Sequence, residues 1–304
     1  MKVVLLAGGG GGARFARGLH DALGPGELTV VGNVGDDIDI LGLHVSPDLD
    51  GLLYALADLI DEKRGWGRAD ETWSALESVG EWGGESWFRL GDLDLGLHLV
   101  RTQALREGAQ LSEVTERLAR RAALRSRILP ATDDRLRTMV VTAAGTFEFQ
   151  EWYVRRGHRD DVDAVEYEGA DTATPAAGVL TALAGADVIL IAPSNPYLSI
   201  GPILAVQEIR QSIERRNVRC VAVSPLVGGA AVTGPAGRML SRMAGGSTPR
   251  HVTDRYVGLI DCLVIDESDA PGEASVELVV TQTLMRDRAA ARRLAEAVLE
   301  AACA

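Results

Sequence analysis

Cysteine and aromatic residues are scarce in this sequence. The 304 residues include only three cysteines, and aromatic residues make up 5% of the chain. Cys220, Cys262 and Cys303 are widely spaced, which fits a reducing compartment and neither a disulfide framework nor a zinc site. The five histidines contain no His-x-x-x-His pair, so a helical metalloprotease motif is excluded.

Positive charge and long apolar runs are also lacking. The chain has 31 basic and 43 acidic side chains, which gives a formal net charge of −12. Binding to nucleic acid or to an anionic membrane requires a basic face, so we expect neither partner. No apolar run approaches the length that crosses a bilayer, and Val3–Ala7 is too short for the core of a signal peptide. We therefore predict a cytoplasmic protein.

Glycine, in contrast, is abundant, with 34 residues. The first cluster, Gly8–Gly12, follows the apolar run Lys2–Ala7, which predicts a strand buried on both faces. Residues 13–23 then carry apolar side chains at helical spacing, and residues 28–34 predict a second buried strand. Strand, glycine turn, helix and strand in this order form a βαβ unit.

The same alternation returns in the second half of the chain. The pattern predicts a strand over residues 187–192, a helix over 202–214, a strand over 218–223 and a terminal helix over 286–302. Residues 259–265 and 276–280 are interpreted as edge strands. Between the two halves, residues 137–143 and 147–154 are separated by a glycine turn and predict a hairpin.

Residues 63–130 have a different character. Four of the five tryptophans lie here, and helical patterns over residues 92–107 and 112–124 follow one another without a convincing strand. We interpret the stretch as a helical insertion that covers a site, with Ser112 as a helix cap. The chain is predicted to be a single α/β domain over residues 1–304, with a doubly wound, mostly parallel Rossmann-like sheet and this insertion at about 63–130.

The first glycine cluster is typical of a phosphate-binding turn. Gly8, Gly10 and Ala13 match the pattern of two glycines and a small third residue that opens a helix after a strand. Bare backbone amides at such a helix N-terminus can hold a pyrophosphate. Asp36 lies 23 residues after Ala13, close to where a nicotinamide enzyme binds a ribose hydroxyl. An NAD-dependent dehydrogenase is therefore one open interpretation, and a turn that binds nothing is another.

Carboxylates gather after the second predicted strand. Asp36 and Asp37 end that strand, and Asp48 and Asp50 open the next predicted helix, which Ser46 is expected to cap. Adjacent carboxylates at strand ends repel each other unless a cation lies between them, and a hard divalent cation such as Mg²⁺ is the usual guest. Asp48 is equally well explained as an ordinary first-turn residue. The pair Asp36 and Asp37 favours a Mg²⁺ site over a plain dehydrogenase site.

Two later loops are candidates for the same cleft. Ser194 and Asn195 directly follow the most apolar predicted strand, and ligands in open α/β sheets bind outside the carboxyl ends of strands. Their polar side chains suit recognition of a base or a ribose, although an Asn-Pro turn explains them as well. The glycines at 228–229 and 234 follow the next predicted strand and could supply further backbone amides.

Single histidines and aromatic residues near these loops have a structural explanation beside a functional one. His44 lies between the carboxylates and could move protons, and His98 precedes Arg101 by three residues, but a lone histidine is more often structural. Trp87 and Phe88 could form a stacking floor for a flat ring or belong to the core.

Seven segments of the sequence resemble, in the same order, those of a known enzyme family. They are residues 1–14 (MKVVLLAGGGGGAR), 32–37 (GNVGDD), 46–50 (SPDLD), 70–73 (DETW), 87–92 (WFRLGD), 149–152 (FQEW) and 192–204 (APSNPYLSIGPIL). Together they are similar to the 2-phospho-L-lactate transferase family of coenzyme F-420 biosynthesis, including its phosphoenolpyruvate-transferring branch. The resemblance spans roughly residues 1–240, and seven motifs in order are far more specific than any one of them.

This resemblance implies a metal-dependent transfer. Family members join a deazaflavin alcohol (7,8-didemethyl-8-hydroxy-5-deazariboflavin) to the lactyl or enolpyruvyl phosphate of a guanosine diphosphate donor and release GMP. By resemblance, Asp36, Asp37 and Asp50 are the catalytic residues and the ligands of Mg²⁺. The glycine loop would hold phosphate, Ser194 and Asn195 would face the guanosine, and the insertion would cover the deazaflavin. The substrate-binding candidates are Gly8, Gly9, Gly10, Gly11, Gly12, Arg14, Asp48, Trp87, Ser194, Asn195 and Gly229.

One stretch departs from the family pattern, and some questions stay open. The family often carries a lysine where this chain has residues 228–235 (GGAAVTGP), so Arg14 or Arg238 would have to steady the diphosphate. A related group with the same glycine-rich opening binds sugar nucleotides and regulates carbon metabolism, so a binding protein without turnover is the main alternative. The lactyl and enolpyruvyl groups differ by two hydrogens, and the sequence does not distinguish them. The apolar edge strands favour a homodimer.

Overall fold

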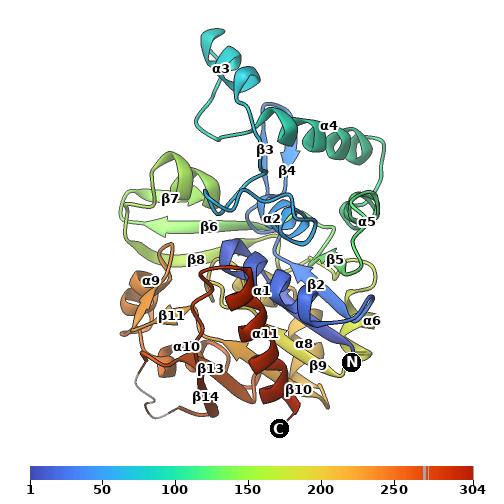
Figure 1. Ribbon diagram of the computed structural model, residues 1–304. Coiled ribbons are helices and arrows are strands. Elements are labelled where there is room, and N and C mark those ends of the chain that lie inside the picture. The colour runs from blue at the N-terminus through green and yellow to red at the C-terminus, as the bar shows by residue number, and fades with distance from the viewer. Residues whose placement is uncertain (270–271, 273, 304) are drawn as a thin grey trace.

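The computed structural model describes all residues of the chain except 270, 271, 273 and 304. Its centre is a sheet in the order β14-β13-β10-β9-β1-β2-β5, in which all neighbours are parallel (Figure 1). The strands are β1 (Val3–Ala7), β2 (Leu28–Gly32), β5 (Arg127–Pro130), β9 (Val188–Ile191), β10 (Arg219–Val223), β13 (Cys262–Asp266) and β14 (Glu277–Thr281). Every residue of β1 and β9 is buried, which explains their apolar sequences without alternation.

The chain starts in the middle of this sheet and winds outward in both directions. β1 pairs with β2 on one side and with β9 on the other. The loops that follow β1 and β9 therefore leave the sheet at the point where the winding direction changes, which is where open α/β sheets bind ligands. The predicted doubly wound, mostly parallel Rossmann-like sheet is confirmed.

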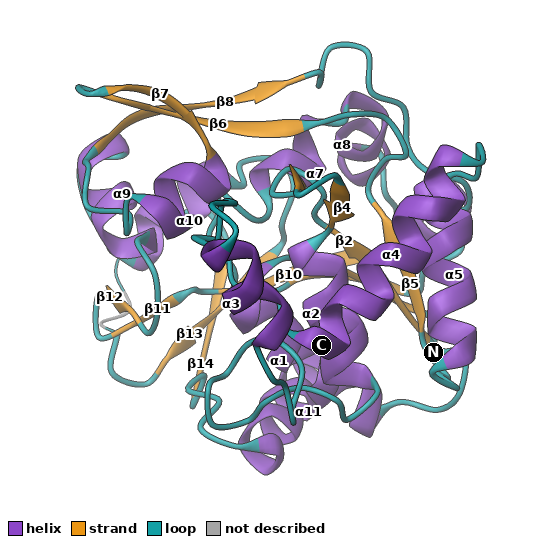
Figure 2. Ribbon diagram, turned by 90° about the horizontal axis from the view of Figure 1, so that it is seen from above, coloured by secondary structure: helices purple, strands orange, loops and turns teal. Residues whose placement is uncertain are grey.

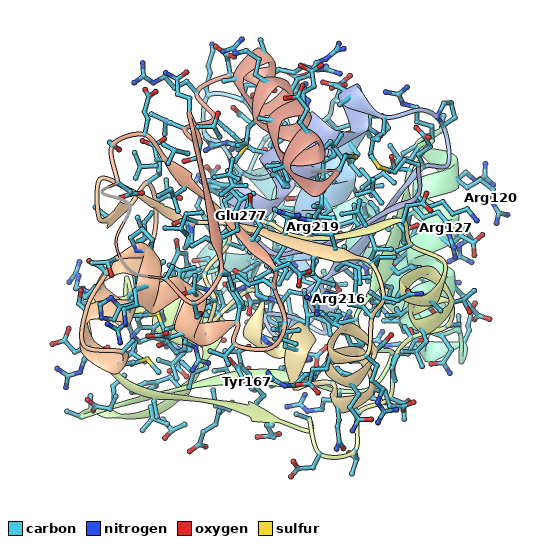
Figure 3. The ribbon with its side chains drawn as sticks, turned by 90° about the horizontal axis from the view of Figure 1, so that it is seen from below. Arg120, Arg127, Tyr167, Arg216, Arg219 and Glu277 are labelled. Carbon is cyan, nitrogen blue, oxygen red and sulfur yellow. The ribbon has the colours of Figure 1, made fainter. Side chains whose placement is uncertain are left out.

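Helices cover both faces of the sheet. They are α1 (Gly9–Ala22), α2 (Pro47–Leu56), α3 (Ser74–Glu81), α4 (Asp92–Arg106), α5 (Leu111–Arg121), α6 (Val179–Ala184), α7 (Gly201–Ala205), α8 (Gln207–Glu214), α9 (Ala236–Met243), α10 (Pro249–Arg255) and α11 (Arg288–Cys303). Views from above and below place α11 and α8 on opposite faces (Figures 2 and 3). α1 packs so closely on α11 that a Cβ on Gly18 would lie 2.3 Å from the carbonyl oxygen of Ala291, so this contact requires glycine.

Smaller sheets and hairpins lie outside the central sheet. A three-stranded antiparallel sheet has the order β7-β6-β8, and two short hairpins pair β3 with β4 and β11 with β12. Their bounds are β3 (Ile38–Ile40), β4 (Leu43–Val45), β6 (Arg137–Thr142), β7 (Gly145–Glu148), β8 (Val162–Glu168), β11 (Leu226–Val227) and β12 (Ala230–Ala231). In Figure 1, α3 and α4 lie at the top of the molecule, beyond β3 and β4. None of the described helices is both long and apolar enough to span a membrane.

The predicted helical insertion contains α3, α4 and α5, but it also contains a strand. Residues Arg127–Pro130 form β5 and pair with β2 at the edge of the central sheet, so the expectation of no strand before residue 130 is wrong. The cap of α5 also differs from the prediction. Gln110 caps this helix together with Glu113, whereas Ser112 lies inside it and donates through its hydroxyl to Asp133 at 2.8 Å.

Three further predictions are corrected by the structure. The predicted strand over residues 147–154 ends at Glu148, and Glu151–Arg155 form the single π-helical turn η1. Stacking between Phe149 and Tyr153, with ring centroids 5.1 Å apart, needs such a turn because the residues are four positions apart. The helix predicted over 202–214 is divided at Val206 into α7 and α8. Of the two strands predicted as edges, β14 is an edge and β13 is an inner strand.

Candidate active site

The glycine loop and the loop after β9 are in direct contact. The Ser194 hydroxyl donates a hydrogen bond of 2.7 Å to the carbonyl oxygen of Gly8. A Cβ on Gly11 would lie 2.7 Å from the carbonyl oxygen of Pro193, so a side chain there would push the loops apart. The two predicted ligand-binding loops therefore meet at the switch point of the sheet, as the strand pattern predicts.

Asp48 connects the start of α1 to the start of α2. Its Oδ1 accepts a hydrogen bond of 2.8 Å from the Gly9 amide, and its Oδ2 accepts one of 2.9 Å from the Asn33 side chain. Burial raises the pKa of Asp48 to about 6, and the nearby charge of Asp37 acts in the same direction. This carboxyl lies at the N-terminus of α1, where free backbone amides would also attract an anionic ligand.

Asp36 and Asp37 are buried, with 5% and 4% of their surfaces exposed. Asp37 accepts hydrogen bonds at Oδ2 from the Ser46 hydroxyl (2.9 Å) and from the His44 ring (3.1 Å). The Oδ1 atoms of both aspartates have no hydrogen-bond partner among the described residues. Burial and the charges of Asp48 and Asp37 raise the pKa of Asp36 well above its ordinary value.

These three side chains, Asp36, Asp37 and Asp48, form what we call the carboxylate cluster. Buried carboxylate oxygens without partners are costly unless something positive binds them, and a hard divalent cation accepts such oxygens as ligands. The unpartnered oxygens of Asp36 and Asp37 therefore fit Mg²⁺ as two carboxylate ligands. Among the described residues, no group of three or more His, Cys, Asp or Glu side chains is placed to hold one ion by itself.

Asp50 lies in a different environment. Its Oδ2 accepts a hydrogen bond of 3.0 Å from Arg101, whose second terminal nitrogen donates to Oδ1. Arg101 is 1% exposed and reaches Asp50 from α4, so the pair ties the insertion to α2. Burial lowers the pKa of the neighbouring His98 to about 4, and the charge of Arg101 contributes to the shift. Both oxygens of Asp50 are thus engaged by a buried cation.

Two predicted loop residues are already engaged by other groups of the chain. The side-chain oxygen of Asn195 accepts hydrogen bonds from the amides of Tyr197 (2.9 Å) and Leu198 (3.2 Å). The Gly229 amide donates to Asp269 at 2.6 Å, in a turn where Gly229 has a φ of +75°. Both contacts stabilise loop conformation and leave these groups less available to a ligand.

The predicted cations and the predicted stacking residue differ in their surroundings. Among the described residues, no carboxylate lies within 4.0 Å of the Arg14 guanidinium, which lies close to Gly65 in the loop between α2 and α3. Arg238 is held by the carbonyl oxygen of His158. Trp87 is half-buried and makes an edge contact with Phe88, with ring centroids 5.7 Å apart. Its indole nitrogen has no hydrogen-bond partner among the described residues.

Several residues that build the site are missed by the sequence analysis. Asn33 and Gln150 hold Asp48 and Asp36, since the Gln150 amide donates to the carbonyl oxygen of Asp36 at 3.1 Å. Ser46, predicted as a helix cap, makes no cap hydrogen bond and instead donates to Asp37. Asn33 and Gln150 both lie in the segments that carry the family resemblance, which is the available signal.

Fold and site together define a Rossmann-like α/β protein in which a glycine loop at a helix N-terminus and buried carboxylates, two of them with unpartnered oxygens, lie beyond the carboxyl ends of the central strands. The family described as 2-phospho-L-lactate transferase CofD matches residues 3–301. The chain belongs to this family.

Named relatives agree with this assignment. The chain is similar to the phosphoenolpyruvate transferase of Kitasatospora aureofaciens, with 49% identity over 91% of this chain and 88% of the relative. The corresponding protein of Streptomyces coelicolor is 46% identical over 89% of this chain and 86% of the relative. That of Thermobifida fusca is 42% identical over 99% of this chain and 98% of the relative. The chain is therefore a transferase of coenzyme F-420 biosynthesis, as its motifs predict.

The fold also matches solved structures. Two crystal structures of a UPF0052-family protein from Bacillus halodurans align with TM-scores of 0.63 and 0.66. They are 18% and 19% identical to this chain, cover 98% of it, and are themselves covered over 98% and 99% of their lengths. At this identity the likeness shows the shared α/β fold and says nothing of activity. The dehydrogenase and the sugar-nucleotide regulator, left open by the sequence, have no support among the named relatives.

Proposed function

We propose that this transferase uses a phosphoenolpyruvyl donor and depends on Mg²⁺. Relatives that align with almost the whole chain are named phosphoenolpyruvate transferases, which supports the enolpyruvyl over the lactyl group. The proposed reaction joins the deazaflavin alcohol to the phosphoenolpyruvyl group of a guanosine diphosphate donor and releases GMP. The observation that carries the metal-dependent chemistry is the pair of unpartnered, buried Oδ1 atoms of Asp36 and Asp37.

Asp36 and Asp37 are the proposed Mg²⁺ ligands. Mg²⁺ at phosphate-transferring sites is usually held by one or two carboxylates together with substrate phosphates, so two protein ligands suffice. When bound, Mg²⁺ would offset the negative charge of the diphosphate and of the phosphoryl group in transfer. We assign Asp50, which the resemblance also implies as a ligand, to positioning α2 through its pair with Arg101.

The glycine loop and Arg14 are proposed to bind the diphosphate. The first turn of a helix leaves backbone amides without intrahelical acceptors, and Asp48 uses that of Gly9. The amides of Gly10 and Gly11 are then the proposed donors to phosphate oxygens. Arg14 follows on the same helix without a carboxylate partner, which supports it as the substitute for the family lysine.

The chemistry proposed for the site is an in-line displacement at phosphorus. The ribityl hydroxyl oxygen of the deazaflavin forms a bond to the phosphorus that carries the three-carbon acid. The anhydride bond breaks, and GMP leaves with the bonding electrons. Asp48 is the proposed acceptor of the hydroxyl proton, because its pKa is raised to about 6 and it adjoins the glycine loop. Trp87 in the insertion is proposed to contact the deazaflavin ring.

Turnover with purified substrates tests this function. The full chain would be incubated with the deazaflavin alcohol and the enolpyruvyl donor, with and without Mg²⁺, and both GMP and the fluorescent product would be quantified. We expect equimolar GMP and product with Mg²⁺, none with EDTA, and at least about tenfold lower kcat/KM with the lactyl donor. Saturable binding of a sugar nucleotide without any turnover would instead identify a regulatory binding protein.

A further inference from the structure

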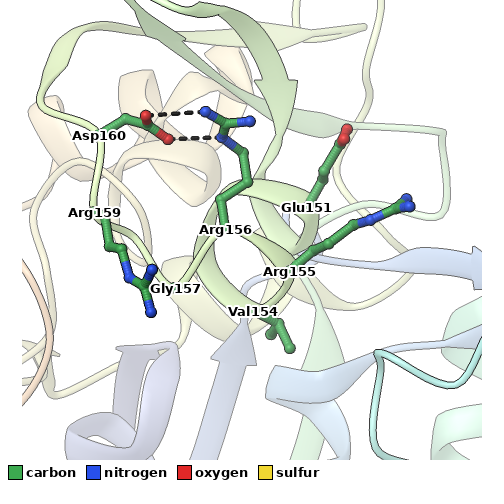
Figure 4. A pocket seen from close by; sticks show the side chains of 7 residues that line it. All are labelled: Glu151, Val154, Arg155, Arg156, Gly157, Arg159 and Asp160. Carbon is green, nitrogen blue, oxygen red and sulfur yellow. Dashed lines mark hydrogen bonds and ion pairs between the residues drawn. The ribbon is translucent and has the colours of Figure 1, made fainter.

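A cavity lies on the segment that follows Gln150, a residue that contacts the backbone of Asp36 in the carboxylate cluster. It has a volume of about 530 Å³ and is lined by Glu151, Val154, Arg155, Arg156, Gly157, Arg159 and Asp160 (Figure 4). Gln150, one residue before the lining begins, donates to the carbonyl oxygen of Asp36. The cavity therefore starts next to a residue that contacts the proposed Mg²⁺ site.

The lining holds three arginines against two carboxylates, so it carries a net positive charge. Arg156 is paired with Asp160 through two hydrogen bonds of 2.6 and 2.9 Å. Arg155 contacts Glu85 at 3.4 Å, with both side chains more than half exposed, and its guanidinium also lies 5.8 Å from the centroid of the Trp87 ring. Among the described residues, no carboxylate lies within 4.0 Å of the Arg159 guanidinium. In Figure 4 the Glu151 carboxylate and the Arg159 guanidinium point in different directions.

The segment that carries Arg159 is held rigidly. Tyr153 stacks on Phe149 and on His158, with ring centroids 5.1 and 4.7 Å away. Trp152 is fully buried, and its indole nitrogen donates to the carbonyl oxygen of Asp160 at 3.2 Å. These contacts fix the backbone on both sides of Arg159, so the side chain projects from a rigid segment.

The same turn also reaches the carboxylate cluster. Burial raises the pKa of Tyr153, and the charges of Asp36 and Asp48 add to the shift, so this ring lies within the field of both carboxylates. Its hydroxyl is 3.6 Å from the position of a Cβ on Gly234, in the glycine-rich loop after β10. One short turn thus borders the acidic reaction site on one side and the basic cavity on the other.

We propose that this basic cavity binds the carboxylate of the three-carbon acid in the donor, with Arg159 as its main contact. The inference rests on the proposed function. The acid carboxylate is attached one carbon away from the transferred phosphate, so it must be placed close to three aspartates that repel it. A guanidinium offers two parallel N–H donors that match a carboxylate, which makes Arg159 a suitable partner. Arg155 would add a second, more exposed positive charge.

Separate titrations of the two halves of the donor test this assignment. Phosphoenolpyruvate and GDP would each be titrated with Mg²⁺ into the wild-type chain and into Arg159→Gln. We expect the affinity for phosphoenolpyruvate to fall at least about tenfold and that for GDP to stay within about twofold. Arg159→Lys, which keeps the positive charge but lacks the two parallel N–H donors of the guanidinium, should recover part of the affinity. An unchanged phosphoenolpyruvate affinity, or a loss confined to GDP, would overturn the assignment.

Controls separate a local effect from a loss of structure or of function. Arg120→Gln removes the same charge from an exposed position on α5 at the margin of the molecule (Figure 3) and should match the wild type. Arg159→Gln should keep the wild-type melting temperature, since this side chain forms no ion pair with any residue that the structure describes. If wild-type turnover occurs but Arg159→Gln has unchanged kcat/KM, this inference fails and the proposed function stands. If the wild type shows no turnover, the proposed function itself fails.

Discussion

Asp48 and Asp50 are two residues apart on α2, yet they lie in opposite electrostatic surroundings. Asp48 joins Asp36 and Asp37, whose Oδ1 atoms have no partner among the described residues. Asp50 meets Arg101, which donates to both of its oxygens. One side of the helix thus faces negative charge that Ser46 and His44 meet at only one oxygen of Asp37, and the other side faces a matched pair.

The difference separates two uses of a buried carboxylate. A buried charge with a matched partner fixes one helix on another, and here it joins the insertion to the central domain. A buried charge without a partner costs stability in the free protein, and a ligand that supplies positive charge recovers that cost. The cluster therefore has the character of a binding site, and the Asp50–Arg101 pair has the character of a structural contact.

The largest effect is expected from Asp37→Asn. The amide keeps the shape of the side chain but weakens the proposed Mg²⁺ ligand, which should lower turnover by about 10³-fold. Because one of several repelling charges is removed, the melting temperature should stay the same or rise. GMP release at saturating Mg²⁺ measures the first effect, and thermal unfolding measures the second.

Asp39 provides the matched control for this substitution. It follows in the same acidic run, but its carboxylate is 60% exposed and contacts His44 and Arg137 instead of the cluster. Asp39→Asn should stay within about threefold of wild-type turnover, as exposed ion pairs contribute little. Equal losses in both variants would remove the distinction between the cluster and its surroundings.

Arg101→Met tests the opposite side of α2. The substitution leaves Asp50 buried without its cation, and breaking such a pair costs about 3–5 kcal/mol. Urea unfolding should show this loss, and the double variant Arg101→Met/Asp50→Leu should recover most of it. The double variant should also keep its Mg²⁺ affinity in the presence of GDP, measured by calorimetry. Loss of Mg²⁺ binding there would return Asp50 to the metal site.

A smaller effect is expected from Asn195→Ala. The side chain accepts hydrogen bonds from two backbone amides within its loop, so its removal should cost about 1–2 kcal/mol of stability and loosen the loop that the family resemblance assigns to the guanosine. Donor affinity should fall while deazaflavin affinity, followed by its fluorescence, stays unchanged. A weakened deazaflavin affinity would show that this loop serves the acceptor instead.

Local pattern was sufficient to predict the parts of the fold that depend on neighbouring residues. The run Lys2–Ala7, the glycines and the next buried strand define β1, α1 and β2, because apolar runs and glycine turns act over short distances. β5 was missed since its four residues include arginine and proline and its pairing with β2 fixes it. The π-helical turn was missed because its aromatic residues also fit a strand.

The candidate site likewise contains features that local sequence predicts and features that it does not. Residues that follow parallel strands gather beyond the carboxyl ends of those strands, and this rule predicts that Asp36 and Asp37 lie near the glycine loop. In the structure both aspartates follow the end of β2, and Asp48 of the same cluster contacts the glycine loop. The partner of Asp50 lies 51 residues away on another helix, so no local pattern could pair them. The environment of a carboxylate depends on how helices dock, and that is set by the tertiary fold.

The smallest expected effect is on the pH dependence of stability. Here Asp48 in the cluster is compared with Asp94, which lies beside the Asp50–Arg101 pair. Burial raises the pKa of each to about 6, above the ordinary value of 3.8. A carboxyl with a raised folded-state pKa binds its proton more tightly in the folded chain, so its contribution to stability is lost as pH rises through 6. For each group we expect about 1 kcal/mol between pH 5 and pH 7, a part of the full shift because the rest is lost below pH 5.

Thermal unfolding of the metal-free chain between pH 5 and pH 7 checks this difference. The melting temperature should fall across the range, and both Asp48→Asn and Asp94→Asn should flatten the curve. Adding Mg²⁺ and GDP should remove the pH dependence that Asp48 contributes, since a bound cation favours the ionised carboxylates of the cluster. The contribution of Asp94, which is bonded to the Tyr54 hydroxyl, should persist. Equal responses of the two positions to Mg²⁺ and GDP would mean that the cluster is not electrostatically distinct from the surroundings of the Asp50–Arg101 pair.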